Sequence, residues 1–171
     1  MLGGVPAADL AGFVVQVLKT LGLPPGDAGR VADLMVEADL PGYDTHGVFR
    51  LRQYVNRLRG GGTNATARPR LVQETPATAL IDGDNGMGHF AMATACQLAM
   101  EKARVVGFGW VGVRGRNHAG PAALYVRPQA QGGMIGLCAA VGSANHVAPF
   151  WGHRSVAWHQ PDCRVRAQRR P

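Results

Sequence analysis

A chain of 171 residues is long enough for one ordinary domain, and its 46% hydrophobic and 17% charged residues are typical of globular proteins and not of disordered ones. Three widely spaced cysteines exclude a disulfide framework and favour a reducing, cytoplasmic location. No apolar run approaches the roughly 20 residues of a membrane span, and we expect no signal peptide.

The net charge of +7 is concentrated near the C-terminal end. The last 18 residues hold one acidic residue, Asp162, and the following five arginines: Arg154, Arg164, Arg166, Arg169 and Arg170. A short arginine-rich tail without apolar periodicity is more often solvated than a nucleic-acid-binding element. We therefore expect no nucleic-acid partner, and we expect residues 153–171 to be disordered.

The first part of the chain predicts three helices. Residues 7–21 and 27–40 repeat apolar side chains at intervals of three and four, and Asp27 is a plausible N-cap of the second helix. A third helix is predicted over 45–59, and it ends at the three glycines of 60–62.

The later part of the chain alternates strands with helices. Proline cannot donate a backbone hydrogen bond, so a helix beginning near Pro121 should break at Pro128. The other predicted elements are strands at 71–72, 77–82, 108–113 and 134–141 and a helix at 89–105. Helices first and mixed strands later indicate an α/β or α+β architecture.

Thr45 and His46 open the first group of candidate functional residues, which continues to Arg50 and Tyr54. On a helix, positions 46, 50 and 54 lie on one face. A histidine can transfer a proton near neutral pH, and an arginine one turn away can bind a carboxylate with two hydrogen bonds. The spacing alone fits a solvated helix face at least as well.

Asn117, His118 and Gly120 form the second group, directly after the strand predicted at 108–113. Polar residues between a strand and a helix often contact ligands, and His118 is a possible acid or base there. An ordinary loop, with Gly120 serving its turn, explains the same pattern.

A glycine-rich segment over 83–88 has the spacing GxxGxG and not the GxGxxG of a dinucleotide-binding loop. We interpret it as a turn between a strand and a helix. The other histidines show neither H-x3-H nor HExxH spacing, so no metal site is predicted; they are His89, His146, His153 and His159.

Several motifs together resemble the malate/L-lactate dehydrogenase family, the type-2 NAD(P)-dependent 2-hydroxy-acid dehydrogenases. The resemblance covers roughly residues 5–157. Its motifs are 38–40, Asp44-Thr45-His46-Gly47, Tyr54-Val55, Thr75-Pro76 through Gly83-Asp84, Val113-Arg114, Asn117-His118 and Val147-Ala148-Pro149. The resemblance implies a homodimer and a mixed, largely antiparallel nucleotide-binding sheet that is not a Rossmann fold. It assigns residues 1–70 to a helical substrate and dimerisation domain and 71–152 to part of an NAD(P)-binding domain.

The resemblance also implies roles for single residues. His46 matches the proton donor, His118 matches the second active-site histidine, and Arg50 matches the residue that holds the carboxylate of a small 2-hydroxy or 2-keto acid. The remaining substrate-binding residues implied are Thr45, Tyr54 and Ser143. The residues implied for NAD or NADP are Asn117, Gly120 and Pro149.

This sequence also departs from the family pattern. Ala119 stands where phenylalanine is usual, His89 stands where glutamine is usual, and Pro128 falls inside an expected helix. Thr45 replaces the usual serine and keeps the hydroxyl group.

The tail differs from the family most. Members are roughly twice as long and continue with Leu-Gly-Thr-Asn-Pro-Ile-Ala. Codons that encode residues 157–164 of this chain can also encode that motif when they are read one nucleotide later. We therefore expect a frameshifted tail from about 153–157 onward and weak or absent turnover by this chain. The alternative function is a non-enzymatic remnant that binds a carboxylate or a partner subunit.

Overall fold

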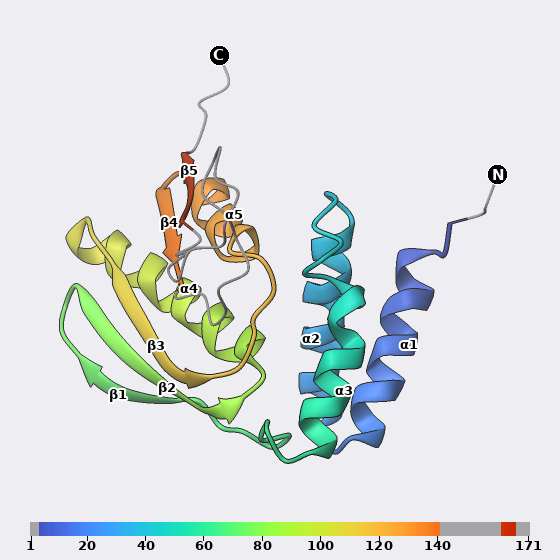
Figure 1. The fold of residues 1–171 in the computed structure, drawn as a ribbon. Coiled ribbons are helices and arrows are strands. Elements are labelled where there is room, and N and C mark those ends of the chain that lie inside the picture. Colours follow the sequence, from blue (N-terminus) through green and yellow to red (C-terminus); the bar gives the residue numbers. More distant parts are fainter. Residues whose placement is uncertain (1–3, 141–161, 167–171) are drawn as a thin grey trace, which may run out of the picture.

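The N-terminal helices pack side by side in the computed structural model, which describes residues 4–140 and the backbone of residues 162–166. Helices α1 (Ala7–Thr20) and α2 (Pro25–Asp39) confirm the first two predicted helices to within two residues, and α3 (Leu51–Arg59) lies beside them (Figure 1). Their shared core consists of fully buried side chains, chiefly Val14, Leu18, Val31 and Met35. Burial of these apolar faces holds the three helices together.

The expected N-cap of α2 was wrong, because Asp27 lies inside the helix. The helix begins instead at Pro25, with Pro24 as its N-cap. Proline suits the first helical position because its fixed φ already matches the helix and its missing N–H would have no partner there.

The expected helix over 45–59 was also wrong at its start. His46 lies in a turn, a 3-10 helix η1 (Val48–Arg50) follows, and α3 begins only at Leu51. The carboxylate of Asp39, at the end of α2, accepts the Val48 N–H at 3.0 Å. A Cβ on Gly47 would overlap this carboxylate, so the contact needs glycine. His46 therefore does not share a helix face with positions 50 and 54.

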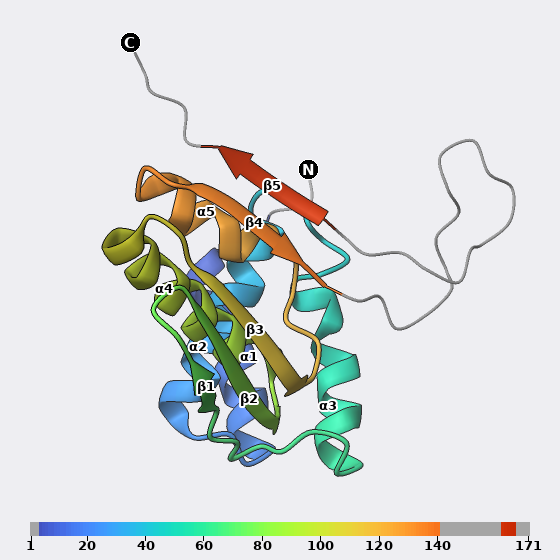
Figure 2. The same cartoon turned by 90° about the vertical axis from the view of Figure 1, so that its left-hand side faces the viewer.

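A three-stranded mixed sheet follows, in the order β1 (Arg70–Glu74), β2 (Thr78–Gly86) and β3 (Trp110–Arg116). β1 pairs antiparallel with β2, whereas β3 pairs parallel with β2. The crossover between the parallel strands is α4 (Gly88–Val106), which covers one face of the sheet (Figure 2).

Helix α4 joins the sheet to the helical part of the molecule. Ala91 and Ala95 of α4 pack against Ile81 of the sheet. At the start of the same helix, Met87 and Phe90 pack into the core of α1, α2 and α3. The position of α4 therefore fixes where the loop after β3 meets α3.

The chain continues through α5 (Ala123–Gln131) and a second, two-stranded antiparallel sheet of β4 (Ile135–Ala139) and β5 (Asp162–Arg166). The expected break at Pro128 was wrong, because α5 runs through this proline. Leu124, Tyr125 and Val126 are buried on α5, and their packing offsets the lost hydrogen bond. The strand β5 lies in the tail, where the sequence pattern predicted no regular structure. In the part of the chain described here, no helix has the length and apolar character of a membrane span.

We predict opposite effects of adding a methyl group to two helical glycines. A Cβ on Gly88 would overlap the backbone oxygen of Asn117, so Gly88→Ala should displace the loop after β3 and cost about 1–3 kcal/mol of unfolding free energy. Gly29, inside α2, has nothing within 4 Å of its Cβ position, so Gly29→Ala should add about 0.5–1 kcal/mol. Urea unfolding of both variants measures the difference, and equal effects would contradict the close approach at Gly88.

Candidate active site

Four segments bring a tyrosine and three histidines together. His46 comes from the turn before η1, Tyr54 from α3, His89 from the first turn of α4, and His118 from the loop after β3. The ring centroids of His46 and His118 are 5.5 Å apart, and those of Tyr54 and His118 are 5.9 Å apart. Residues from both sequence groups therefore meet in one place, although they do so through tertiary packing and not through helical spacing.

His118 has one ring nitrogen held by two hydrogen bonds. The backbone N–H of Gly120 donates to His118 Nδ1 at 3.2 Å, and the Tyr54 hydroxyl lies 2.7 Å from the same nitrogen. A backbone N–H can only donate, so Nδ1 is the acceptor and the tyrosine hydroxyl must donate as well. Neutral His118 therefore carries its proton on Nε2.

Burial and nearby positive charge keep the histidines neutral. Burial, followed by the charges of Arg50, His46 and Arg116, lowers the pKa of His118 to about 4. Burial and then Arg50 also lower the pKa of His46. Burial raises the pKa of Tyr54, so its hydroxyl keeps the proton that it donates to His118.

Arg50 is held by its own chain neighbours. Its Nε donates to the backbone oxygen of Thr45 at 2.6 Å, and its NH1 group donates to Gln53 Oε1 at 3.0 Å. The hydroxyl of Thr45 lies 2.9 Å from His46 Nδ1. These contacts place a guanidinium beside the two histidines, where its charge lowers both of their pKa values.

The glycine-rich end of β2 anchors the loop that carries His118. The Asn117 side-chain amide donates to Asn85 O at 2.8 Å and to Gly86 O at 3.2 Å. Asp84 and Asn85 take left-handed backbone conformations, with φ of 52° at both positions. The interpretation of 83–88 as a turn was wrong, because residues 83–86 belong to β2 and α4 begins at Gly88. The irregular end of β2 positions Asn117.

The comparisons with known proteins decide the family. A model of the malate/L-lactate dehydrogenase family matches residues 5–163. This chain belongs to that family. It is 43% identical over 157 residues to the malate dehydrogenase of Pyrococcus abyssi. The aligned part covers 92% of this chain and 43% of that protein. It is 38% identical over 149 residues to the L-sulfolactate dehydrogenase of Methanocaldococcus jannaschii, and the aligned part covers 87% of this chain and 43% of that protein.

Solved structures of the family confirm the α/β fold. The malate dehydrogenase from Pyrococcus horikoshii OT3 superposes with a TM-score of 0.86 at 39% identity, over 98% of this chain and 48% of that one. The sulfolactate dehydrogenase from Methanocaldococcus jannaschii gives a TM-score of 0.86 at 35% identity, over 95% and 47%. The chain spans less than half the length of these family members.

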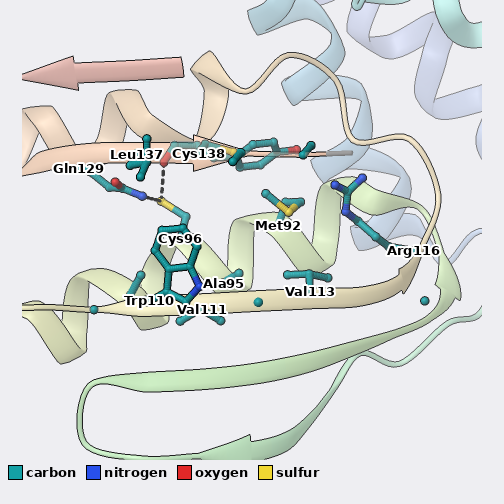
Figure 3. Close-up of a pocket in the computed structure, with 17 residues that line it drawn as sticks. Met92, Ala95, Cys96, Trp110, Val111, Val113, Arg116, Gln129, Leu137 and Cys138 are labelled. Carbon is teal, nitrogen blue, oxygen red and sulfur yellow. Dashed lines mark hydrogen bonds between the residues drawn. The ribbon is translucent and has the colours of Figure 1, made fainter. Parts of the chain in front are cut away.

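A cavity of about 510 Å³ runs along β3, on the side that faces β4. Figure 3 shows apolar side chains of α4 and β3 along its wall and Arg116 at one end. Arg116 is the last residue of β3 and directly precedes Asn117 and His118. Of the residues that line the cavity, Arg116 is the nearest in the chain to His118. The volume of the cavity is within the usual range of ligand pockets.

Two predicted residues, Ser143 and Pro149, lie outside the described residues. Among the described residues, no group of three potential ligands is arranged to hold a metal ion. Sequence reasoning missed the contact of Gln53 with Arg50 and the place of His89 behind Tyr54. Only the departure of His89 from the family pattern singled it out, and nothing in the sequence singled out Gln53.

We predict that His118 stays uncharged down to about pH 5. The unfolded chain takes up this proton near pH 6.5, whereas the folded chain takes it up near pH 4. The unfolded state thus binds more protons between these values, so stability falls as the pH falls through this window. Ring NMR titration measures the pKa, and urea unfolding at pH 7 and pH 5 measures the stability. His118→Asn should reduce the pH dependence, and His46 and His89, whose pKa values are also lowered, should account for the rest. A His118 pKa near 6.5 would contradict the account.

Proposed function

We propose that the protein carries the proton-transfer and carboxylate-binding part of an NAD(P)-dependent dehydrogenase for small 2-hydroxy acids. The observation that supports this best is the pairing of two neutral imidazoles, His46 and His118, beside the guanidinium of Arg50. A 2-keto acid presents a carbonyl next to a carboxylate, and this set offers a group for each.

Arg50 binds the substrate carboxylate in this proposal. Guanidinium groups match carboxylates with two parallel hydrogen bonds. Thr45 O and Gln53 Oε1 hold the side chain at Nε and NH1, and this orients the guanidinium before substrate arrives. A bound carboxylate would offset the positive charge that lowers the pKa of both histidines, so substrate binding should raise both pKa values.

His46 transfers the proton, and His118 polarises the carbonyl. The Nε2–H of His118 is the donor available to a substrate oxygen, because Nδ1 already accepts two hydrogen bonds. On reduction of a keto acid, His46 acts in its protonated form, which a bound carboxylate favours; the carbonyl oxygen gains this proton, the carbonyl carbon gains a hydride, and His46 is left neutral. On oxidation of the alcohol, neutral His46 takes the hydroxyl proton.

NAD or NADP supplies and accepts the hydride when bound. The cavity along β3 fits part of such a cofactor in volume, and it ends at Arg116 next to His118. Asn117 and Gly120 are proposed cofactor contacts beyond Arg116, although the Asn117 side-chain amide and the Gly120 N–H are already bonded to the protein. Pro149 remains a proposed contact outside the described residues.

The names of the relatives point to small hydroxy acids such as malate and sulfolactate as the substrate class.

We also propose a homodimer, because exposed Leu40, Tyr43 and Phe49 cluster in one segment beside the site. A reducing, cytoplasmic location remains a proposal that rests on the sparse, widely spaced cysteines of the sequence. The helical and NAD(P)-binding parts at 1–70 and 71–152, and a frameshifted tail, remain proposals.

We predict that turnover needs a chain whose reading frame is restored after about residue 157. NADH and NADPH oxidation with pyruvate and oxaloacetate should be measured for the 171-residue chain and for the restored chain. In the restored chain, His46→Ala should lower kcat by about 10²–10⁴-fold. Arg50→Ala should lower kcat/KM by roughly 10–100-fold. Exposed Arg52, which makes no ion pair among the described residues, gives the control Arg52→Ala with unchanged activity.

Other outcomes would change the proposal. Turnover by the 171-residue chain, lost in His46→Ala, would show that this half suffices for the reaction. No turnover by either chain, with oxamate binding that needs Arg50, would favour a carboxylate-binding remnant. Equal loss in Arg50→Ala and Arg52→Ala would contradict the role given to Arg50.

A further inference from the structure

We propose that His89 is a positioning residue that fixes the ring tautomer of His118. The inference rests on the proposed function for its catalytic meaning, because a tautomer matters only if His118 faces substrate. The geometric statement itself concerns the protein alone. It assigns a role to a buried histidine that neither binds substrate nor transfers a proton in the proposed reaction.

His89 lies behind the site and is completely buried, with 0% exposure. Its ring stands edge-on to the Tyr54 ring, with centroids 5.7 Å apart and planes at 81°. On another side, its Nε2 lies 3.4 Å from the position that a Cβ on Gly120 would take. The ring therefore packs against both Tyr54 and the backbone at Gly120.

Tyr54 and Gly120 are the two residues that donate hydrogen bonds to His118 Nδ1. A hydrogen bond weakens steeply when its donor tilts or withdraws, so the placement of both donors decides how firmly Nδ1 is held as an acceptor. The His89 ring lies against the ring of one donor residue, Tyr54, and beside the Cα of the other, Gly120. One side chain thereby supports both hydrogen bonds.

Stability alone does not explain a histidine at this position. Both ring nitrogens of His89 are buried without a hydrogen-bond partner in the described structure. Such a group costs free energy that an apolar side chain of similar shape would not cost. Burial lowers the pKa of His89 to about 3, so the ring stays neutral and adds no charge beside His118. A flat, neutral ring at this place is consistent with a positioning role.

The test compares His89→Leu, which removes the flat ring and keeps an apolar side chain, with His89→Phe, which keeps a ring. The readout is the ¹⁵N chemical shift of the His118 ring, which reports the tautomer ratio independently of any activity. His89→Leu should lower the ratio of the Nε2–H to the Nδ1–H tautomer by about fivefold, the equivalent of one lost hydrogen bond. His89→Phe should restore the ratio.

Two controls separate positioning from general destabilisation. Met35→Ala opens an equally buried site in the helical core and should lower the Tm without changing the tautomer ratio. Tyr54→Phe removes one donor directly and should reproduce the effect of His89→Leu. An unchanged tautomer ratio in His89→Leu would overturn the proposal, as would an equal shift in Met35→Ala. Neither result would affect the dehydrogenase proposal, which depends on turnover.

Discussion

The site depends on two hydrogen bonds that converge on one nitrogen, His118 Nδ1. One donor, Tyr54, comes from α3 and lies 64 residues from His118 in the chain. The other, the N–H of Gly120, belongs to the loop after β3. Because one donor is a backbone N–H, the direction of both bonds is fixed. The orientation of the remaining Nε2–H, and hence the chemistry available to a substrate oxygen, follows from this pair.

The fold holds those two donors in place relative to His118. Helix α4 packs against the sheet on one side and the three helices on the other, so its first turn sets the distance between Tyr54 and the loop. Gly88 lets the loop approach α4 closely, and Asn117 ties the loop to the end of β2. Arg50 then acts on both histidines through its charge, which links carboxylate binding to proton transfer in the proposed reaction.

Sequence reasoning succeeded where one element determines its own structure. Apolar periodicity placed the first two helices, and ordered motifs gave the family. It failed where a distant residue decides. The Asp39 carboxylate delays the third helix, so His46 reaches the site from a turn, and packing carries α5 through Pro128. The hydrogen bond of buried Tyr54 to His118 joins segments that no spacing rule connects.

The central claim is that Tyr54 and His118 are energetically coupled through the hydrogen bond to Nδ1. A double-mutant cycle with Tyr54→Phe and His118→Leu, followed by urea unfolding, measures that coupling directly. The account predicts a favourable interaction energy of about 0.5–1.5 kcal/mol between the two side chains. Strictly additive effects, with no interaction energy, would show that the contact does not hold His118 and would contradict the account.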